Sequence, residues 1–178
     1  MLVMLSSNDF ITLYLGLELQ SLSLYVLAST KKDSLKSSEA GLKYFILGAL
    51  ASGFFLFGVS LLFGITGTTS FTLLSFNYLN PNEISLLLVF SVVLIISSMA
   101  FKLSIAPFHM WTPDVYEGAA TPVTSFFASV PKMAAIIVLI RILYVPFVDF
   151  TNNWYQIIVF VSIFSIALGS ITAIWQTN

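Results

Sequence analysis

Charged residues are scarce in this chain of 178 residues. Only 8% of the residues are charged, whereas 58% are hydrophobic, and soluble domains usually carry about 25% charged residues. So few charges cannot cover a surface that faces water, which excludes a soluble globular domain and a disordered segment. The net charge of −1 also excludes a nucleic-acid-binding protein, because that function needs a basic surface. The composition predicts a protein that crosses a membrane several times.

Cysteine is absent, and histidine occurs once, at His109. Without cysteine the chain can form no disulfide, no thiolate metal site and no iron–sulfur ligation, and it has no cysteine nucleophile. A single histidine excludes a metal site built from several histidines and haem held by two. We therefore expect no cofactor and no metal ion in this chain.

Five apolar stretches are long enough to be transmembrane helices. A helix needs about 20 apolar residues to cross the hydrocarbon core, and none of the stretches alternates in the way that barrel strands do. We expect an all-α membrane fold with a single membrane domain over residues 1–178. Its spans are predicted at about 10–30, 42–65, 84–108, 122–148 and 154–175.

The connectors between these stretches differ in charge. Residues 31–43 contain four lysines, including Lys43, which lies four residues after Glu39 at the start of the second span. Lysine and arginine collect on the cytoplasmic or matrix side of a membrane. The 31–43 connector is therefore predicted inside, with the beginning of the first span outside and the end of the fifth inside.

Three charged residues lie within apolar stretches, where a charge is expensive. Glu18 and Lys132 fall near the middle of the first and fourth spans, and Lys102 lies within the third. A charge at the bilayer centre costs about 3 kcal/mol on insertion scales. A salt bridge between Glu18 and Lys102 is one explanation, but no second acid remains for Lys132. We favour an ion pathway, the usual role of ionisable residues inside a membrane.

Each of these three residues belongs to a polar stripe on its own helix. Spacings of three and four residues place the members of a stripe on one face, and we expect these faces to point into the bundle. The stripes are Tyr14, Glu18, Ser21 and Tyr25; Ser91, Ser98 and Lys102; and Ser125, Ser129 and Lys132.

Prolines follow the buried Lys102 closely. Pro107 removes a backbone donor and clashes with the preceding turn, so we expect the helix to break just after Lys102. Pro113 and Pro122 are predicted to break it again, and Pro131 to kink the helix beside Lys132. Broken backbone at membrane depth lines a cavity or is buried in protein, and transporters place ion sites there.

Other polar residues near the predicted break have two interpretations each. His109 can relay protons, since imidazole titrates near neutral pH, or it can be a hydrogen-bonded structural residue. Asp114 and Glu117, near the inner surface, can form an entry for protons, although a solvated loop is the favoured interpretation. Arg141 near the outer end of the fourth span is expected to reach the membrane surface with its long side chain.

The segment FKLSIAPFHMWTPDVYEGAATPVTSFFASVPKMA (101–134) is long and specific. It resembles the signature of the antiporter-like proton-pumping subunits of respiratory complex I, most closely the chain 2 group. The segments LGLELQSLSLYVLAS near the start and SIALGSITAIWQTN at the end are similar to the same group. One departure is Ala120, where that family usually has proline.

The resemblance implies a function and a set of site residues. The key acid of the family falls on Glu18, the lysine of its broken helix on Lys102 and its central lysine on Lys132. The implied activity is proton translocation coupled to NADH:ubiquinone oxidoreduction, with no redox centre in this chain. The chemistry of its imidazole adds His109 as a further candidate for proton transfer. The implied location is the mitochondrial inner membrane or, alternatively, the bacterial plasma membrane.

For Lys102 to take part, it must release a proton near neutral pH. Desolvation favours its neutral form, whereas a nearby carboxylate such as Glu18 favours the charged form. Moving or protonating Glu18 would switch Lys102 between holding and releasing a proton, and Lys132 would receive it. Two rival functions remain: a subunit of a multi-subunit cation/proton antiporter, and a structural spacer in the membrane arm.

Partners are also implied. Family members consist of two inverted repeats, of which this chain would supply most of the first and the start of the second. It is expected to be either a fragment or one product of a split gene, and Met1 favours the split. Other complex I membrane-arm subunits and a separate chain would then supply the missing helices. That chain is expected to pack on a small and polar face of the fifth span, formed by Ser162, Ser165, Gly169, Thr172 and Gln176.

Overall fold

The computed structural model describes residues 1–31, 34–77 and 86–175, and these are organised as helices. Five of the helices are long and apolar enough to cross a membrane, so the predicted all-α membrane fold is confirmed. They are α2 (Phe10–Ala28), α3 (Leu35–Thr66), α5 (Leu86–Leu103), α7 (Thr121–Tyr144) and α8 (Thr151–Trp175). The shorter elements are α1 (Leu2–Ser6), α4 (Phe71–Asn77), α6 (Trp111–Gly118) and the 3₁₀ helix η2 (Val148–Phe150).

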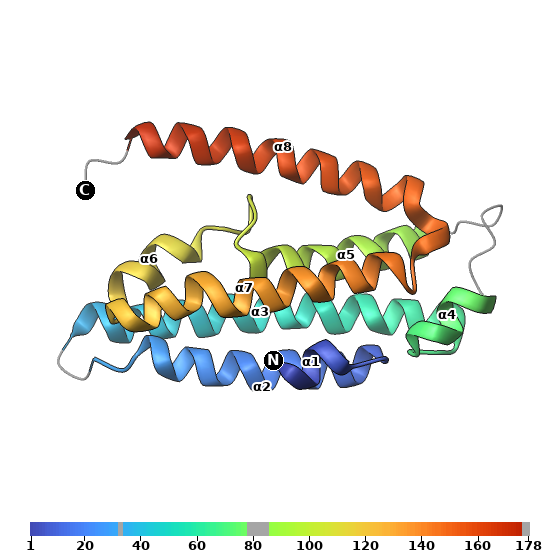
Figure 1. Cartoon of the computed structure of the whole chain (residues 1–178), viewed down its shortest axis with the longest axis horizontal. Helices are drawn as coiled ribbons and strands as arrows, with labels where there is room; N and C mark the ends of the chain where they lie inside the picture. Colours follow the sequence, from blue (N-terminus) through green and yellow to red (C-terminus); the bar gives the residue numbers. More distant parts are fainter. Residues whose placement is uncertain (32–33, 78–85, 176–178) are drawn as a thin grey trace.

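The long helices run side by side along one axis, with α3 through the middle of the molecule (Figure 1). Helix α3 packs against α2, α5 and α6, and α7 packs against α5. Successive long helices run in opposite directions, as short connections between neighbours require. The core between α2, α3, α5 and α7 is apolar and includes the fully buried Phe10, Phe55, Ile95 and Ile142.

Helix α3 begins at Leu35, seven residues before the predicted start of the second span. The hydroxyl of Ser34 accepts a hydrogen bond from the backbone N–H of Ser37 at 3.3 Å and caps the helix, as serine commonly does at this position. Most of the lysine-rich connector is therefore helical, since hydropathy marks where a helix enters lipid and not where it starts. At 1.5 Å per residue, the 32 residues of α3 extend well beyond the ~30 Å hydrocarbon core.

The helix break predicted after Lys102 is confirmed. Helix α5 ends at Leu103, Pro107 lies in the irregular segment that follows, and α6 starts at Trp111. The third span therefore ends five residues before the predicted 108, and its predicted start at 84 lies outside the described residues. Helices α5 and α6 are separated by a stretch of non-helical backbone that projects toward α8 (Figure 1).

Pro113 does not break a helix as predicted, whereas the break predicted at Pro122 is present, because α6 ends at Gly118 and α7 begins at Thr121. Pro113 lies in the first turn of α6, and Pro122 lies in the first turn of α7. Backbone N–H groups in a first turn have no partner within the helix, so proline is tolerated there. Pro131 lies inside α7, directly before Lys132, at the position for which a kink was predicted.

Helix α8 stands apart from the other long helices (Figure 1). Trp154, near the start of α8, is buried. No residue in the most apolar stretch of α8 is buried. A hydrogen bond of 3.1 Å from the backbone N–H of Ala106 to the hydroxyl of Ser165 connects α8 to the broken segment. Among the described members of the predicted polar face, Ser162, Gly169 and Thr172 are exposed.

Candidate functional site

Lys102 is the next-to-last residue of α5, and its side chain crosses to α2. The ammonium group donates a hydrogen bond to the hydroxyl of Ser21, and that hydroxyl in turn donates to the carbonyl of Leu17 at 2.7 Å. Ser21 lies in the middle third of α2. The early end of α5 therefore places Lys102 opposite the middle of a neighbouring span, although it is close to the end of its own helix.

Glu18 lies one helical turn before Ser21 on α2. Its carboxylate accepts a hydrogen bond from the hydroxyl of Ser52 on α3. The salt bridges among the described residues include neither Glu18 nor Lys102, so the direct Glu18–Lys102 pair considered from the sequence is not formed. The acid and the lysine instead bind serines, and the serine bound by Lys102 lies three residues from Glu18 on α2.

Two of the three predicted stripes face the interior. On α2 Ser21 and Tyr25 are buried, and on α5 Ser91 and Ser98 are buried. The prediction is wrong for α7, where Ser125 and Ser129 are exposed. The reason is that α7 packs with the opposite, apolar face, which includes the following buried residues: Phe127, Ala134, Ala135, Val138 and Ile142.

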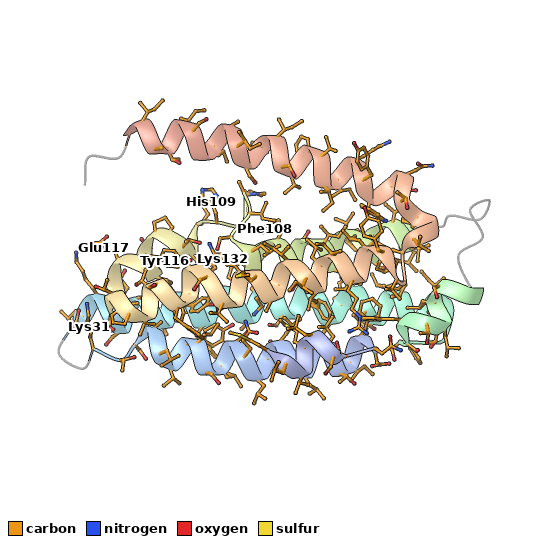
Figure 2. The ribbon with its side chains drawn as sticks, in the orientation of Figure 1. Lys31, Phe108, His109, Tyr116, Glu117 and Lys132 are labelled. Atoms are coloured by element: carbon orange, nitrogen blue, oxygen red, sulfur yellow. The ribbon has the colours of Figure 1, made fainter. Side chains whose placement is uncertain are left out.

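Lys132 is partly buried near the middle of α7. Its ammonium nitrogen lies 5.4 Å from the centre of the Tyr116 ring on α6, a distance at which a cation is attracted to an aromatic face. Figure 2 shows the two side chains between α6 and α7. The absence of a second intramembrane acid left Lys132 without an expected partner, and the partner found is an aromatic ring.

His109 lies in the segment that leads into α6, and Figure 2 shows it on the side toward α8. Its Nδ1 atom is buried and has no hydrogen-bond partner in the described part of the chain. The same holds for the side-chain oxygens of Thr112 and Tyr116. The sequence analysis missed these two residues, although both lie inside the quoted motif at spacings of three and seven from His109.

One end of the molecule carries a group of ion pairs. The ammonium groups of Lys36 and Lys43 on α3 lie 2.7 Å from the carboxylates of Glu117 and Asp114 on α6, and Lys43 also lies 2.7 Å from Glu39. These residues line a cavity of about 130 Å³. Asp114 and Glu117 were interpreted as a solvated loop; they are exposed, but they belong to a helix and bind α3.

Arg141 has a structural contact within the chain. One guanidinium N–H donates to the backbone carbonyl of Leu5 at 2.6 Å, and the guanidinium carbon lies 5.9 Å from the centre of the Phe71 ring. Instead of only reaching the membrane surface, as predicted, Arg141 ties α7 to α1 and lies against α4.

The described residues contain no group of three or more His, Asp or Glu side chains that could hold a metal ion. The polar groups that they hold on the spans and on the segment between α5 and α6 include one carboxylate, two ammonium groups, an imidazole and several hydroxyls. These groups bind and exchange protons, and hydroxyls can pass them on through hydrogen bonds. Their arrangement defines a helical membrane protein with ionisable groups held between its spans.

Comparison with known proteins specifies this class further. Residues 7–178 match the family described as "NADH:quinone oxidoreductase/Mrp antiporter, TM", and the chain belongs to this family. It is 57% identical to NADH-quinone oxidoreductase subunit N 1 of Rhizobium meliloti and 51% identical to subunit N of Paramagnetospirillum magneticum. Each match covers 100% of this chain and 37% of the relative, so the chain spans little more than a third of their length.

Solved structures show the same fold. A chain of respiratory complex I from Thermus thermophilus matches 78% of this chain and 30% of its own length, with a TM-score of 0.68 and 40% identity. A chain of the Mrp complex from Dietzia sp. matches 86% of this chain and 29% of its own, with a TM-score of 0.74 and 25% identity. The resemblance to antiporter-like membrane subunits is thus confirmed. The relatives are named subunit N, and the narrower chain 2 assignment stays a prediction.

Proposed function

We propose that this chain takes part in proton translocation as a membrane-arm subunit of a complex I type NADH:quinone oxidoreductase. The observation that carries the proposal is that Glu18 on α2 and Lys102 near the end of the broken helix α5 each bind a serine, and that the serine bound by Lys102 lies three residues from Glu18 on α2. Identities of 51–57% to subunits named NADH-quinone oxidoreductase subunit N support the same conclusion.

The geometry supports a switch between Glu18 and Lys102. The two groups bind Ser52 and Ser21, whose hydroxyls are weaker partners than an opposite charge. If the carboxylate leaves Ser52 and approaches Lys102, it favours the ammonium form; if it moves back or is protonated, the desolvated lysine is free to release a proton. In the proposed cycle, Glu18 exchanges its bond to Ser52 for a contact with Lys102 and then returns.

Lys132 and His109 are proposed as the later proton-transfer residues. Helix α6 follows the end of α5 along the chain and contacts α7, where its Tyr116 lies beside Lys132. His109, Thr112 and Tyr116 each present a buried polar atom without a partner among the described residues. Such atoms usually bind ordered water, and water joined to side-chain hydroxyls would carry the proton along α6.

A cation/proton antiporter is the second candidate, supported by the fold shared with a chain of the Mrp complex. The identity to that chain is 25%, compared with 40% to the chain of respiratory complex I from Thermus thermophilus, so complex I is favoured. A structural spacer in the membrane arm is the third candidate. It gives no reason for placing Glu18, Lys102 and Lys132 between spans at the cost of a buried charge.

The proposed partners are other membrane-arm subunits and a further chain or segment that supplies the helices present in the longer relatives. The exposed small and polar face of α8 supports packing against another helix, because small residues let two helices approach closely within a membrane. The proposed location is the mitochondrial inner membrane, with the bacterial plasma membrane as the alternative, which the bacterial relatives support. The proposal assigns the redox chemistry to other subunits and none to this chain.

The test is purification of the chain from its native membrane under mild detergent conditions. We expect it to co-purify with an assembly that oxidises NADH and reduces quinone, and to take part in proton uptake only while NADH is oxidised. Cation/proton exchange by the purified assembly, driven by a pH gradient without any redox substrate, would favour the antiporter and contradict the complex I assignment.

A further inference from the structure

One side of α6 and of the segment before it carries polar atoms that the described part of the chain leaves unpaired. They are Nδ1 of His109, Oγ1 of Thr112 and the hydroxyl of Tyr116, and all three are buried. Residues at spacings of three and four follow one face of a helix. Buried polar atoms normally have a hydrogen-bond partner, so this face is built to hold water or another polar group.

The ring of Tyr116 lies directly under the neighbouring lysine. The 5.4 Å between Nζ of Lys132 and the ring centre places the cation within the range of a cation–π contact. The ammonium group is thereby held beside the unpaired atoms of α6. In the described part of the chain no carboxylate forms a salt bridge with Lys132, so the ring is its charge-stabilising partner.

Tyr116 has two further contacts, one through its ring and one through its backbone. The ring of Trp111 meets it edge-on, with centroids 6.4 Å apart and planes at 86°. The hydroxyl of Thr124 on α7 donates to the backbone carbonyl of Tyr116 at 3.2 Å. The contact with Trp111 packs against the ring, the bond from Thr124 holds the Tyr116 backbone beside α7, and neither contact involves Lys132.

Trp111 also connects this contact to the end of α5. Its indole N–H donates to the carbonyl of Phe101, directly before Lys102, at 3.2 Å. Its ring stacks on Tyr44 of α3 with centroids 4.6 Å apart and planes at 12°. A continuous set of contacts therefore joins the peptide next to Lys102 to the ring under Lys132.

We propose that Tyr116 is a positioning residue whose ring holds the side-chain nitrogen of Lys132 at the polar face of α6. There the neutral amine accepts a proton that has passed along that face, and the ring stabilises the ammonium group that forms. The proposal rests on the proposed proton-translocating function and adds a residue to it. The ring carries this role, because it faces the cation, whereas the hydroxyl adds only one of three polar groups along α6.

The test compares variants of Tyr116 in the assembled complex, with the rate of NADH-driven proton pumping into sealed vesicles as the measured quantity. Tyr116→Leu removes the ring, and we expect proton pumping to fall by about two- to thirtyfold, the range that corresponds to a cation–π contact. Tyr116→Phe keeps the ring, and we expect it to retain most of the pumping. Phe127→Leu is the matched control, since Phe127 is buried in the same aromatic cluster and does not hold Lys132; this variant should pump normally.

The possible outcomes separate this inference from the function on which it rests. If Tyr116→Phe and Tyr116→Leu lose pumping equally, the hydroxyl and not the ring is essential, and the inference is wrong. If Tyr116→Leu pumps like wild type while Lys132→Ala does not, the inference fails and the proposed function stands. If Lys132→Ala also pumps normally, the proposed role of Lys132 fails, and the role of Tyr116 fails with it.

Discussion

Lys102 donates its hydrogen bond to Ser21, one helical turn from Glu18 on α2, and forms no ion pair with that acid. The separation matters because a lysine in a permanent salt bridge holds its proton. A lysine bound to a neutral hydroxyl can take up a proton when a carboxylate approaches and release it when the carboxylate withdraws. The two groups are thus arranged for exchange of partners, while Ser52 holds the carboxylate in its present position.

The role of Glu18 can be tested by removing its charge. We expect Glu18→Gln to lower proton pumping by roughly tenfold or more, because an amide cannot switch the charge state of Lys102. Glu18→Asp should be milder, since it keeps the charge with a shorter reach. The readout is protons pumped per NADH oxidised, and assembly of the complex is checked in parallel. Pumping at the wild-type level in Glu18→Gln would show that the acid has only a structural role.

Ser52 provides a second test of the same arrangement. Ser52→Ala removes the hydrogen bond to Glu18 but leaves every charge in place. We expect a smaller loss of pumping than in Glu18→Gln, because the carboxylate loses one of its two proposed positions and can still reach Lys102. A loss as complete as that in Glu18→Gln would mean that the serine itself transfers the proton.

The ion pairs between α3 and α6 predict a charge-reversal effect. Glu117→Lys places two ammonium groups together at the Lys36–Glu117 contact, so we expect a lower thermal midpoint and weaker assembly of the complex. The double variant Lys36→Glu/Glu117→Lys restores opposite charges and should recover much of the loss. The effect should be modest, since both side chains are exposed and solvent screens the pair. If the double variant is no better than the single one, the pair does not hold α6.

The backbone of α6 approaches α3 closely at Gly118. A Cβ atom at this position would lie 2.6 Å from the carbonyl oxygen of Lys36 and 2.5 Å from the Cβ of Ala40. We expect Gly118→Val to destabilise the fold by about 1–3 kcal/mol, as overpacking generally does. Gly53→Val is the control, because a Cβ there would meet nothing within 4 Å. Equal thermal midpoints for the two variants would contradict the close packing of α6 on α3.

The orientation in the membrane follows from the lysine-rich end. Lys31 is exposed just after α2, at the end of the molecule where Glu117 also lies (Figure 2). Because the chain has no cysteine, a Lys31→Cys variant carries a single reactive thiol within it. We expect an impermeant thiol reagent to label this variant only from the matrix or cytoplasmic side. Labelling from the opposite side alone would invert the proposed topology.

Much of the fold could be predicted because lipid imposes a simple rule. Every span must be long, apolar and helical, so hydropathy located the five long helices, and Pro107 located the break after Lys102. Helix α3 was predicted too short because its first two turns are polar and lie outside the apolar stretch. Pro113 was misinterpreted because a proline is tolerated in the first turn of a helix and breaks a helix further along. The residues around Pro113 did not show that α6 begins at Trp111.

The site was only partly predictable, for a related reason. Glu18, Lys102 and Lys132 were identified because a charge in lipid is expensive, and this argument needs no structure. Their partners are set by helix rotation and by where α5 ends, which composition does not determine. Tyr116 escaped notice because an aromatic residue in a membrane protein is ordinary until a cation is found above its ring.

The central claim is that Lys102 carries protons through this chain, and Lys102→Ala in the assembled complex tests it most directly. Protons pumped per NADH oxidised would be measured in sealed vesicles, together with the rate of NADH oxidation in the presence of an uncoupler and the amount of assembled complex. The account predicts a complex that assembles but shows strongly reduced pumping for each NADH oxidised. An assembled Lys102→Ala complex that pumps at the wild-type ratio would contradict it.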